Sequence, residues 1–161
     1  MSTPIDDTEY KALRESTQDW FRSLTPVQSP ALQQLVHFTS EGFEHLMYKG
    51  SRNMRDRSSQ AMRFKLLRRA VELISLSSTI QEYEETTKSF LVKRHKRKGW
   101  EVKTVYYWGF IAIVRNRKIK VIVRKIGGGQ IHFWSVIPSW TTNRYRDIKL
   151  ISTMKGNPEE D

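Results

Sequence analysis

Residues 105–140 constrain the fold of this chain more than any other segment does. They read VYYWGFIAIVRNRKIKVIVRKIGGGQIHFWSVIPSW, in which β-branched and aromatic runs alternate with the turns Arg115-Asn116-Arg117 and Gly127-Gly128-Gly129. Such a pattern is typical of an antiparallel meander. We expect strands over about 101–107, 109–115, 118–126 and 130–137. The first two of these can also form one long bent strand, because Trp108-Gly109 reads as either a tight turn or a bulge.

Helical patterns precede the meander. Apolar residues recur at helical spacing in residues 7–24 and most clearly in 60–76, and a shorter helix is expected from Thr39 or Ser40 to Lys49. Helices followed by antiparallel strands predict an α+β fold. In that fold the N-terminal helices pack on one face of a C-terminal antiparallel sheet of about four strands.

Prolines divide the chain near its beginning. Residues 25–30, TPVQSP, break the helical pattern and read as a linker, and a short strand is expected at 35–38. We therefore expect an N-terminal helical extension and linker over 1–30, a single α+β domain over 31–151 and a flexible polar tail over 152–161.

The charge of the chain restricts its partners. The formal net charge is +11 in 161 residues, and the excess of basic residues lies beyond residue 50. A strongly basic surface attracts polyanions, which makes nucleic acid the leading partner, with a merely soluble basic surface as the alternative. The absence of cysteine excludes disulfides, thiolate chemistry and Cys-ligated zinc. No window reads as a signal peptide or a transmembrane span, so we expect a cytoplasmic protein with no membrane partner.

The third strand of the meander alternates basic and aliphatic residues. Successive side chains of a strand point to opposite faces, so Ile119, Val121 and Val123 are expected to face the helices. Lys120 and Arg124 then lie on the other face, which is expected to be open to solvent or substrate.

The glycine turn brings the last two strands together. If the middle glycine is the turn centre, Arg124 lies near His132 and Ile122 near Trp134, whereas a slip of one residue replaces Trp134 by Ser135. Arginine, histidine and tryptophan on one sheet face suit RNA, because cations hold phosphates and the indole stacks on a base. An ordinary solvated face with one structural tryptophan is the alternative.

His45 opens a second basic cluster, followed by Lys49, Arg52, Arg55 and Arg57. His45 and Lys49 are four residues apart and share one side of the expected helix. Metal-independent RNA cleavage needs a group that takes the 2′-hydroxyl proton, cations that stabilise the charge on phosphorus and an acid that protonates the 5′-oxygen. A histidine beside lysine and arginine can supply these functions. Helix packing is the alternative role for His45.

Several motifs of other enzyme classes are absent. The sequence holds no HExxH, P-loop, GxGxxG or GxSxG motif. Its histidines, His37, His45, His95 and His132, show no metal-ligand spacing. The glycine triplet lies between strands, so it reads as a hairpin turn and not as a phosphate cradle. We therefore expect no metal site and no cofactor.

The order of these features resembles that of a known family. Val36-His37-Phe38-Thr39 precedes a helix that carries Glu44-His45, a basic segment and a further helix follow, and the meander ends in His132-Phe133-Trp134-Ser135-Val136-Ile137-Pro138. Over about residues 35–140 this order is similar to that of phage- and mobile-element-associated nucleases of the barnase, EndoU, colicin and RelE-like superfamily.

The resemblance implies a metal-independent endoribonuclease of toxin type, with its active site on the open sheet face and the edge of the preceding helix. It implies RNA as the substrate, and an acidic antitoxin or immunity protein is a further candidate partner. His45 matches the helix histidine of the phage-associated members, and Ser135 matches a small polar residue in their final strand. Lys49 and Arg124 stand where basic residues are expected. A barnase-type glutamate base on a central strand is missing, and Glu101 is the nearest substitute in the meander.

The candidate catalytic residues are His45, Lys49, Arg124, His132 and Ser135. We expect His45 to act as acid or base, with His132 as second choice. Lys49 and Arg124 stabilise the transition state, and Ser135 positions a phosphate oxygen. The candidate RNA-binding residues are Arg52, Arg57, Lys120 and Trp134. Two other functions stay open: a non-catalytic nucleic-acid-binding module, such as a regulator or a translation-associated factor, and a domain that docks an acidic protein.

Overall fold

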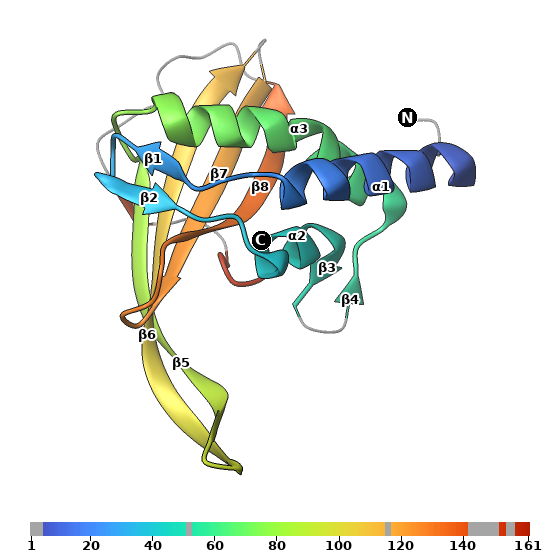
Figure 1. The fold of residues 1–161 in the computed structure, drawn as a ribbon. Coiled ribbons are helices and arrows are strands. Elements are labelled where there is room, and N and C mark those ends of the chain that lie inside the picture. Colours follow the sequence, from blue (N-terminus) through green and yellow to red (C-terminus); the bar gives the residue numbers. More distant parts are fainter. Residues whose placement is uncertain (1–4, 51–52, 115–116, 142–151, 154–156) are drawn as a thin grey trace.

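A computed structural model describes residues 5–50, 53–114, 117–141, 152–153 and 157–161. These residues form an α+β fold, in which three helices pack on one face of an antiparallel sheet (Figure 1). The helices are α1 (Asp7–Arg22), α2 (Ser40–Met47) and α3 (Arg57–Leu76). The fold class predicted from the sequence is therefore confirmed. Within the described ranges no helix combines the length and the apolar character that a membrane crossing requires.

The main sheet follows the predicted meander. In the described part of the chain its strand order is β8-β7-β6-β5-β9. The strands are β5 (Glu82–Arg94), β6 (Arg97–Val114), β7 (Arg117–Ile126), β8 (His132–Thr141) and β9 (Ser152–Thr153). β5 to β8 pair antiparallel, whereas β9 pairs in parallel with β5. Short strands before the sheet form two small hairpins: β1 (Val27–Ser29) with β2 (Gln34–Val36), and β3 (Tyr48–Lys49) with β4 (Asn53–Met54).

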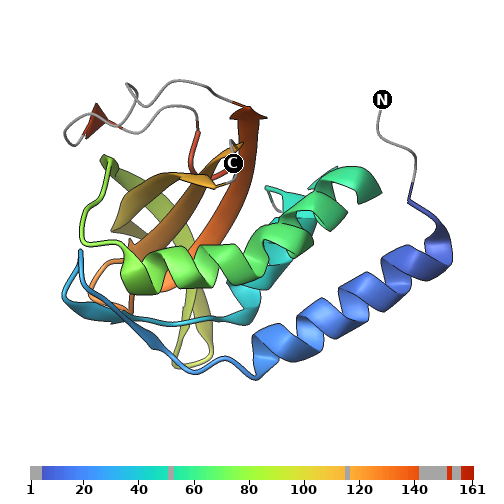
Figure 2. The ribbon, with the colours of Figure 1, turned by 90° about the horizontal axis from the view of Figure 1, so that it is seen from above.

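The larger core lies between the helices and the sheet. α3 lies across the sheet, and α1 lies beside α3 (Figure 2). Phe21 of α1 packs against Phe43 of α2 and Phe133 of β8, with ring centroids 5.5 Å and 6.1 Å apart. Residues 7–22, which the sequence places in an N-terminal extension, thus contribute to the same core as the rest of the chain.

The strands alternate between two apolar environments. Val121 and Val123 belong to the helix-side core, as predicted from their spacing. Ile122 faces the other way and packs with Tyr107 and Trp134 in a second, smaller cluster. We call this side of the sheet, opposite the helices, the outer face. At this second cluster the outer face is apolar, whereas the sequence predicted a surface open to solvent or substrate.

The pairing of β7 with β8 contains a bulge. Arg124 pairs with His132, which confirms the prediction that assumes a centred glycine turn. Ile122 nevertheless pairs with Ser135, because the register shifts between Ile122 and Val123. Trp134 is the extra residue of this bulge, and the shift brings both Trp134 and Ser135 close to the outer face.

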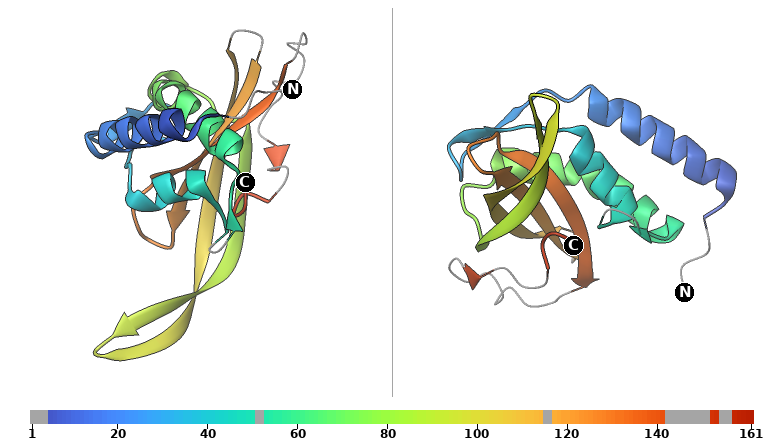
Figure 3. Two further views of the ribbon diagram at one scale, coloured as in Figure 1. Left: turned by 90° about the vertical axis from the view of Figure 1, so that its right-hand side faces the viewer. Right: turned by 90° about the horizontal axis from the view of Figure 1, so that it is seen from below.

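β5 and β6 form one long hairpin that projects beyond the rest of the molecule (Figures 1 and 3). β6 runs without a break through Trp108-Gly109. The first two predicted strands of the meander are therefore one long strand, which was the second of the two predicted arrangements. The turn consists of His95 and Lys96, both with positive φ, as a tight hairpin connection requires. Only residues 105–114 of β6 also pair with β7, so residues 87–104 form a two-stranded arm.

Candidate functional site

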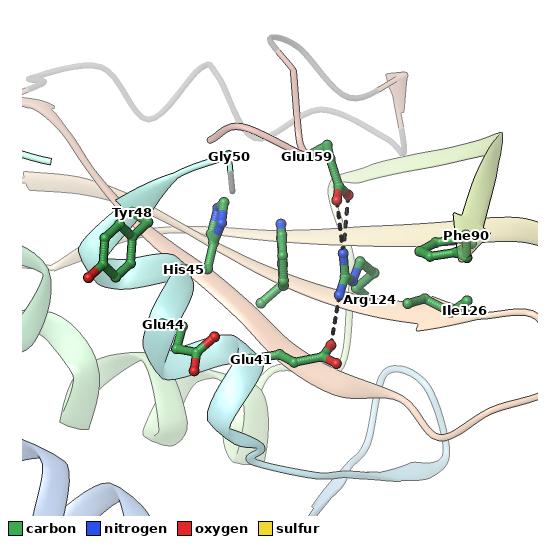
Figure 4. A pocket seen from close by; sticks show the side chains of 10 residues that line it. Glu41, Glu44, His45, Tyr48, Gly50, Phe90, Arg124, Ile126 and Glu159 are labelled. Carbon is green, nitrogen blue, oxygen red and sulfur yellow. Dashed lines mark hydrogen bonds and ion pairs between the residues drawn. The ribbon is translucent and has the colours of Figure 1, made fainter. Parts of the chain in front are cut away.

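A pocket of about 570 Å³ opens on the outer face of the sheet, beside the edge strand β8 along which α2 lies (Figure 4). Its lining residues come from distant parts of the sequence. They include Glu41 and His45 from α2, Phe90 from β5, Arg124 from β7, Trp134 from β8, and Glu159. We call it the Arg124 pocket, and we call residues 157–161 the C-terminal segment.

The guanidinium of Arg124 occupies the centre of this pocket, and its side chain is only 4% exposed. Its Nε donates to His132 Nε2 at 3.1 Å, and its Nη2 donates to Glu41 Oε2 at 3.1 Å. Its Nη1 lies 3.2 Å from both carboxylate oxygens of Glu159 (Figure 4). The group also lies over the Trp134 ring, with Cζ 3.4 Å from the centroid. A planar guanidinium that is held in one orientation can bind an anion through hydrogen bonds of defined geometry.

Trp134 separates Arg124 from His45. The His45 ring stacks on the indole with centroids 4.0 Å apart and an interplanar angle of 19°. Two groups this close to one ring cannot share a face, so His45 and Arg124 cover opposite faces. The indole Nε1 donates to the main-chain oxygen of Pro158 at 2.8 Å. The structure thus leaves neither face of Trp134 for the base stacking expected from the sequence, and the ring instead supports the pocket.

His45 reaches the pocket because α2 approaches β8 very closely. A Cβ on Gly42 would lie 2.4 Å from the main-chain oxygen of Phe133, so only glycine fits there. One helical turn later, the His45 ring is buried, and Arg55 Nη2 lies 3.4 Å from its Nε2. Burial, together with the charge of Arg55, lowers the pKa of His45 from 6.5 to about 3. The imidazole is therefore neutral at neutral pH.

His132 orients Arg124. Its Nε2 accepts the Arg124 Nε–H, so the ring proton is assigned to Nδ1, which lies 3.3 Å from the main-chain oxygen of Gln130. Burial and the adjacent Arg124 charge lower the pKa of His132. Both ring nitrogens are engaged, so His132 is suited to positioning the guanidinium rather than to moving protons.

Glu159 supplies the anion in the pocket. Its carboxylate accepts hydrogen bonds from Lys88 and Tyr107 as well as from Arg124. Burial alone would raise the pKa of Glu159, but the hydrogen bonds from Lys88 and Tyr107 and the charge of Arg124 outweigh it and lower the pKa. Burial and the hydrogen bond to Glu159 raise the pKa of Tyr107, so the phenol stays protonated. Donors from β5, β6 and β7 thus converge on one negative charge.

A second group of donors lies beside the pocket and holds the main-chain oxygen of Asp161. Arg63 Nη1 donates to it at 2.8 Å, Ser135 Oγ at 2.9 Å and Arg55 Nη2 at 3.2 Å. Arg63 also donates to Ser135 Oγ at 2.9 Å. Burial, with the nearby charge of Arg55, lowers the pKa of Arg63 to about 10, which leaves it charged at neutral pH. The C-terminal segment, predicted as part of a flexible tail, is therefore packed against two sets of donors.

The structure gathers most of the predicted catalytic residues. His45, Arg124, His132 and Ser135 lie in or beside the Arg124 pocket. Lys49 lies at its rim, largely exposed, with Nζ 4.0 Å from a carboxylate oxygen of Glu160.

The predicted RNA-binding residues are placed differently. Arg57 forms an ion pair with Asp7 of α1 and does not reach the pocket. Lys120 donates to Glu82 at 2.9 Å and is mostly buried. Arg52 lies outside the described residues.

Several residues that line the pocket, or that contact a lining residue, were not among the candidates. Glu41 precedes His45 by four residues, and this helical spacing is a signal that could have identified it. Lys88, Tyr107 and Glu159 come together only through the tertiary fold, and no local spacing connects them.

No family model, curated protein or solved structure matches this chain. Among the residues that the structure describes, no group of three or more His, Asp and Glu side chains could hold a metal ion. The function must therefore be inferred from the residues of the pocket themselves.

Proposed function

We propose that this protein is a metal-independent endoribonuclease of toxin type. The observation that carries the proposal is the Glu159 carboxylate, which Arg124, Lys88 and Tyr107 hold in the pocket. A phosphodiester presents the same negative charge and the same kind of acceptor oxygens to such donors. The scissile phosphate of RNA then takes the place of the Glu159 carboxylate.

The reaction uses the RNA's own 2′-oxygen as the nucleophile. This oxygen attacks phosphorus, the bond to the 5′-oxygen breaks, and the products are a 2′,3′-cyclic phosphate and a 5′-hydroxyl. Arg124 and Lys88 stabilise the charge that builds on the phosphoryl oxygens, because fixed cations in a partly buried site act strongly on developing charge. Tyr107 is a protonated donor at the phosphate position, and it supplies the proton that the departing 5′-oxygen needs.

Two groups on α2 can accept the proton of the 2′-hydroxyl. His45 is neutral and lines the pocket, which suits a proton acceptor. Its low pKa makes it a weak base, but an RNA phosphate nearby would raise that pKa, since negative charge favours imidazolium. Glu41, one turn earlier and bonded to Arg124, is the second candidate.

The remaining candidates position the substrate. His132 fixes the Nε of Arg124, so it determines how the guanidinium meets the phosphate. Ser135 and Arg63, which hold the main-chain oxygen of Asp161, offer donors for an oxygen of the neighbouring nucleotide. Lys49 at the rim adds an exposed cation.

RNA and the C-terminal segment compete for the same donors under this proposal. The segment must leave Arg124 and Lys88 before a phosphate can bind there. The same chemistry makes the pocket receptive to carboxylates of another chain, which supports an acidic antitoxin or immunity protein as an inhibitor.

The test is cleavage of RNA by the pure protein in the presence of a chelator, with the fragment ends identified by mass. We expect 2′,3′-cyclic phosphate ends, and no cleavage of RNA that carries 2′-O-methyl groups throughout. Arg57→Gln serves as the control, because it removes a cation that lies away from the pocket. Activity that requires added magnesium contradicts the proposal.

A non-catalytic nucleic-acid-binding module is the second candidate. The observation that favours it is that His45 and His132 are both buried and engaged, whereas binding alone needs only the cations. Binding with a steep salt dependence and without cleavage at any protein concentration selects this function.

A further inference from the structure

The β5–β6 hairpin extends past the edge of the β6–β7 pairing as a two-stranded arm. We call residues 87–104 the hairpin arm; in the described part of the chain its strands pair only with each other, from Thr87–Thr104 to Arg94–Arg97 (Figure 3). An isolated two-stranded ribbon buries little apolar surface. Packing in the core therefore does not account for the length of the hairpin arm. Its side chains are available to contact a partner molecule.

Charge distinguishes this arm from an ordinary hairpin. Between residues 87 and 104 the only acidic residue is Glu101, which pairs with Arg94 at 3.2 Å. The basic residues of the arm are Lys88, Lys93, Arg94, Lys96, Arg97, Lys98 and Lys103. All side chains from 93 to 100 are exposed. Such a density of cations is complementary to a polyanion.

One face of the arm carries exposed apolar side chains among these cations. Trp100 is 74% exposed and pairs across the strands with Leu91, which is 54% exposed. Val102, two residues further along the same strand, is 67% exposed. Trp100 is the most exposed large hydrophobic residue in the described part of the chain. An exposed indole between cations can stack on an unpaired base.

The base of the arm belongs to the Arg124 pocket. Lys88 contacts Glu159, and Phe90 lines the pocket. From Lys88 to Arg94 the strand rises about 20 Å, at about 3.3 Å per residue. Lys88 and Phe90 lie on the face of the arm that is turned to the pocket, whereas Trp100 and its cross-strand partner Leu91 lie on the opposite face. A polynucleotide with one phosphate in the pocket therefore reaches Trp100 by passing around the narrow two-stranded arm, which carries basic side chains toward its tip.

We propose that the hairpin arm binds single-stranded RNA that flanks the phosphate in the pocket, with Trp100 stacked on a base and the basic tip on the backbone. This inference rests on the proposed function for the identity of the pocket's ligand. Single-stranded RNA is the occupant because an exposed indole needs an unpaired base and the surrounding cations need phosphates.

The experiment measures the affinity of the full chain for a fluorescent 2′-O-methyl RNA of about 12 nucleotides, which cannot be cleaved but is within the range of single-strand site sizes. Trp100→Ala is expected to weaken binding about 5- to 100-fold. Leu76→Ala is the matched control, because Leu76 is 71% exposed at the end of α3. Unchanged affinity of Trp100→Ala overturns the inference.

A charge variant tests the tip independently. The triple variant Lys93→Gln, Lys96→Gln, Lys98→Gln is expected to reduce the slope of log affinity against log salt by about two, since each phosphate contact with a single strand contributes about 0.7. The control Lys11→Gln, Arg22→Gln, Lys65→Gln removes equal charge from exposed helix positions and leaves the slope unchanged. Equal slopes for both variants contradict the inference.

Two further probes separate the possible failures. A fluorescent poly-glutamate peptide tests whether the arm prefers acidic protein; an equal loss of its binding in Trp100→Ala overturns RNA as the occupant. Cleavage of a dinucleotide, which is too short to reach Trp100, tests only the proposed function. If Trp100→Ala weakens RNA binding as expected but the parent protein does not cleave the dinucleotide, the result supports RNA binding by the arm and contradicts the proposed nuclease activity.

Discussion

Nη1 of Arg124 lies 3.2 Å from each carboxylate oxygen of Glu159. The two residues are far apart in the sequence, and the contact places an acidic side chain on the best-oriented cation of the pocket. Charge-assisted contacts of this kind are among the stronger hydrogen bonds in proteins. Any anionic ligand of Arg124 must therefore first displace Glu159.

Removing this carboxylate should favour RNA. We expect Glu159→Ala to bind single-stranded RNA about tenfold more tightly, because a charge-assisted contact contributes about 1.5–3 kcal/mol and part of this is lost to solvent screening. Fluorescence anisotropy with 2′-O-methyl RNA measures the effect. Glu160→Gln is the control, since the carboxylate of Glu160 lies 4.0 Å from the exposed Lys49 and makes no contact with Arg124 among the described residues. Slower cleavage by Glu159→Ala would instead place this carboxylate in the catalytic machinery.

Arg124 should be irreplaceable by lysine. Arg124→Lys keeps one positive charge but loses the fork that reaches His132, Glu41 and Glu159 together. We expect kcat to fall about 100- to 1000-fold, the loss typical of a missing transition-state donor. Thermal unfolding of the same variant checks that it folds. An unchanged kcat would remove Arg124 from the reaction.

The two proton acceptors can be distinguished by kinetics. If His45 takes the 2′-hydroxyl proton, His45→Ala lowers kcat about 100- to 10,000-fold and removes the acidic limb of the pH–rate profile. If Glu41 does so, Glu41→Gln has this effect instead. Because His45 also stacks on Trp134, circular dichroism and melting of His45→Ala are needed beside the rates. Full activity in both variants excludes both groups as the base.

His45 should make stability depend on pH. Its pKa is about 3 in the folded chain against 6.5 for the free side chain, so the unfolded chain takes up a proton that the folded chain does not. The stabilisation is complete above about pH 6.5 and is lost as the pH falls toward 3. Between about pH 7 and pH 5 this amounts to about 2 kcal/mol. Urea unfolding at both pH values measures it.

The matching variant is His45→Phe, which keeps a ring on Trp134 but cannot titrate. We expect this variant to lose most of the difference between the two pH values. His132 has a lowered pKa as well, and its contribution has the same sign and remains. An identical pH dependence in His45→Phe and the parent contradicts the assignment.

Local patterns in the sequence predicted the parts of the site that depend on periodicity. Alternation along β7 indicated that Val121 and Val123 face the helices, and the glycine turn brought Arg124 beside His132. Both follow from the two-residue repeat of a strand and a short connection.

Other parts depend on contacts that no period encodes. The bulge at Trp134 is a tertiary adjustment, and a turn of three glycines does not specify it. Arg63 drew no prediction, although it shares the buried side of α3 with Phe64 and Leu67. Its partners, Ser135 and the oxygen of Asp161, are distant in the sequence. The place of Glu159 in the pocket could not be predicted either, because a short polar segment has no periodic pattern that indicates where it packs.

The C-terminal segment touches Lys88 at the base of the hairpin arm and Arg63 on α3. The segment therefore contacts both the hairpin arm and α3, which would approach a nucleic acid from different sides. A polymer that displaces Glu159 also frees Lys88. RNA binding at the tip of the hairpin arm and RNA binding at Arg124 are then energetically linked, and each strengthens the other by the same factor. Long strands would then bind in one cooperative event, and the chain would discriminate its ligands by length.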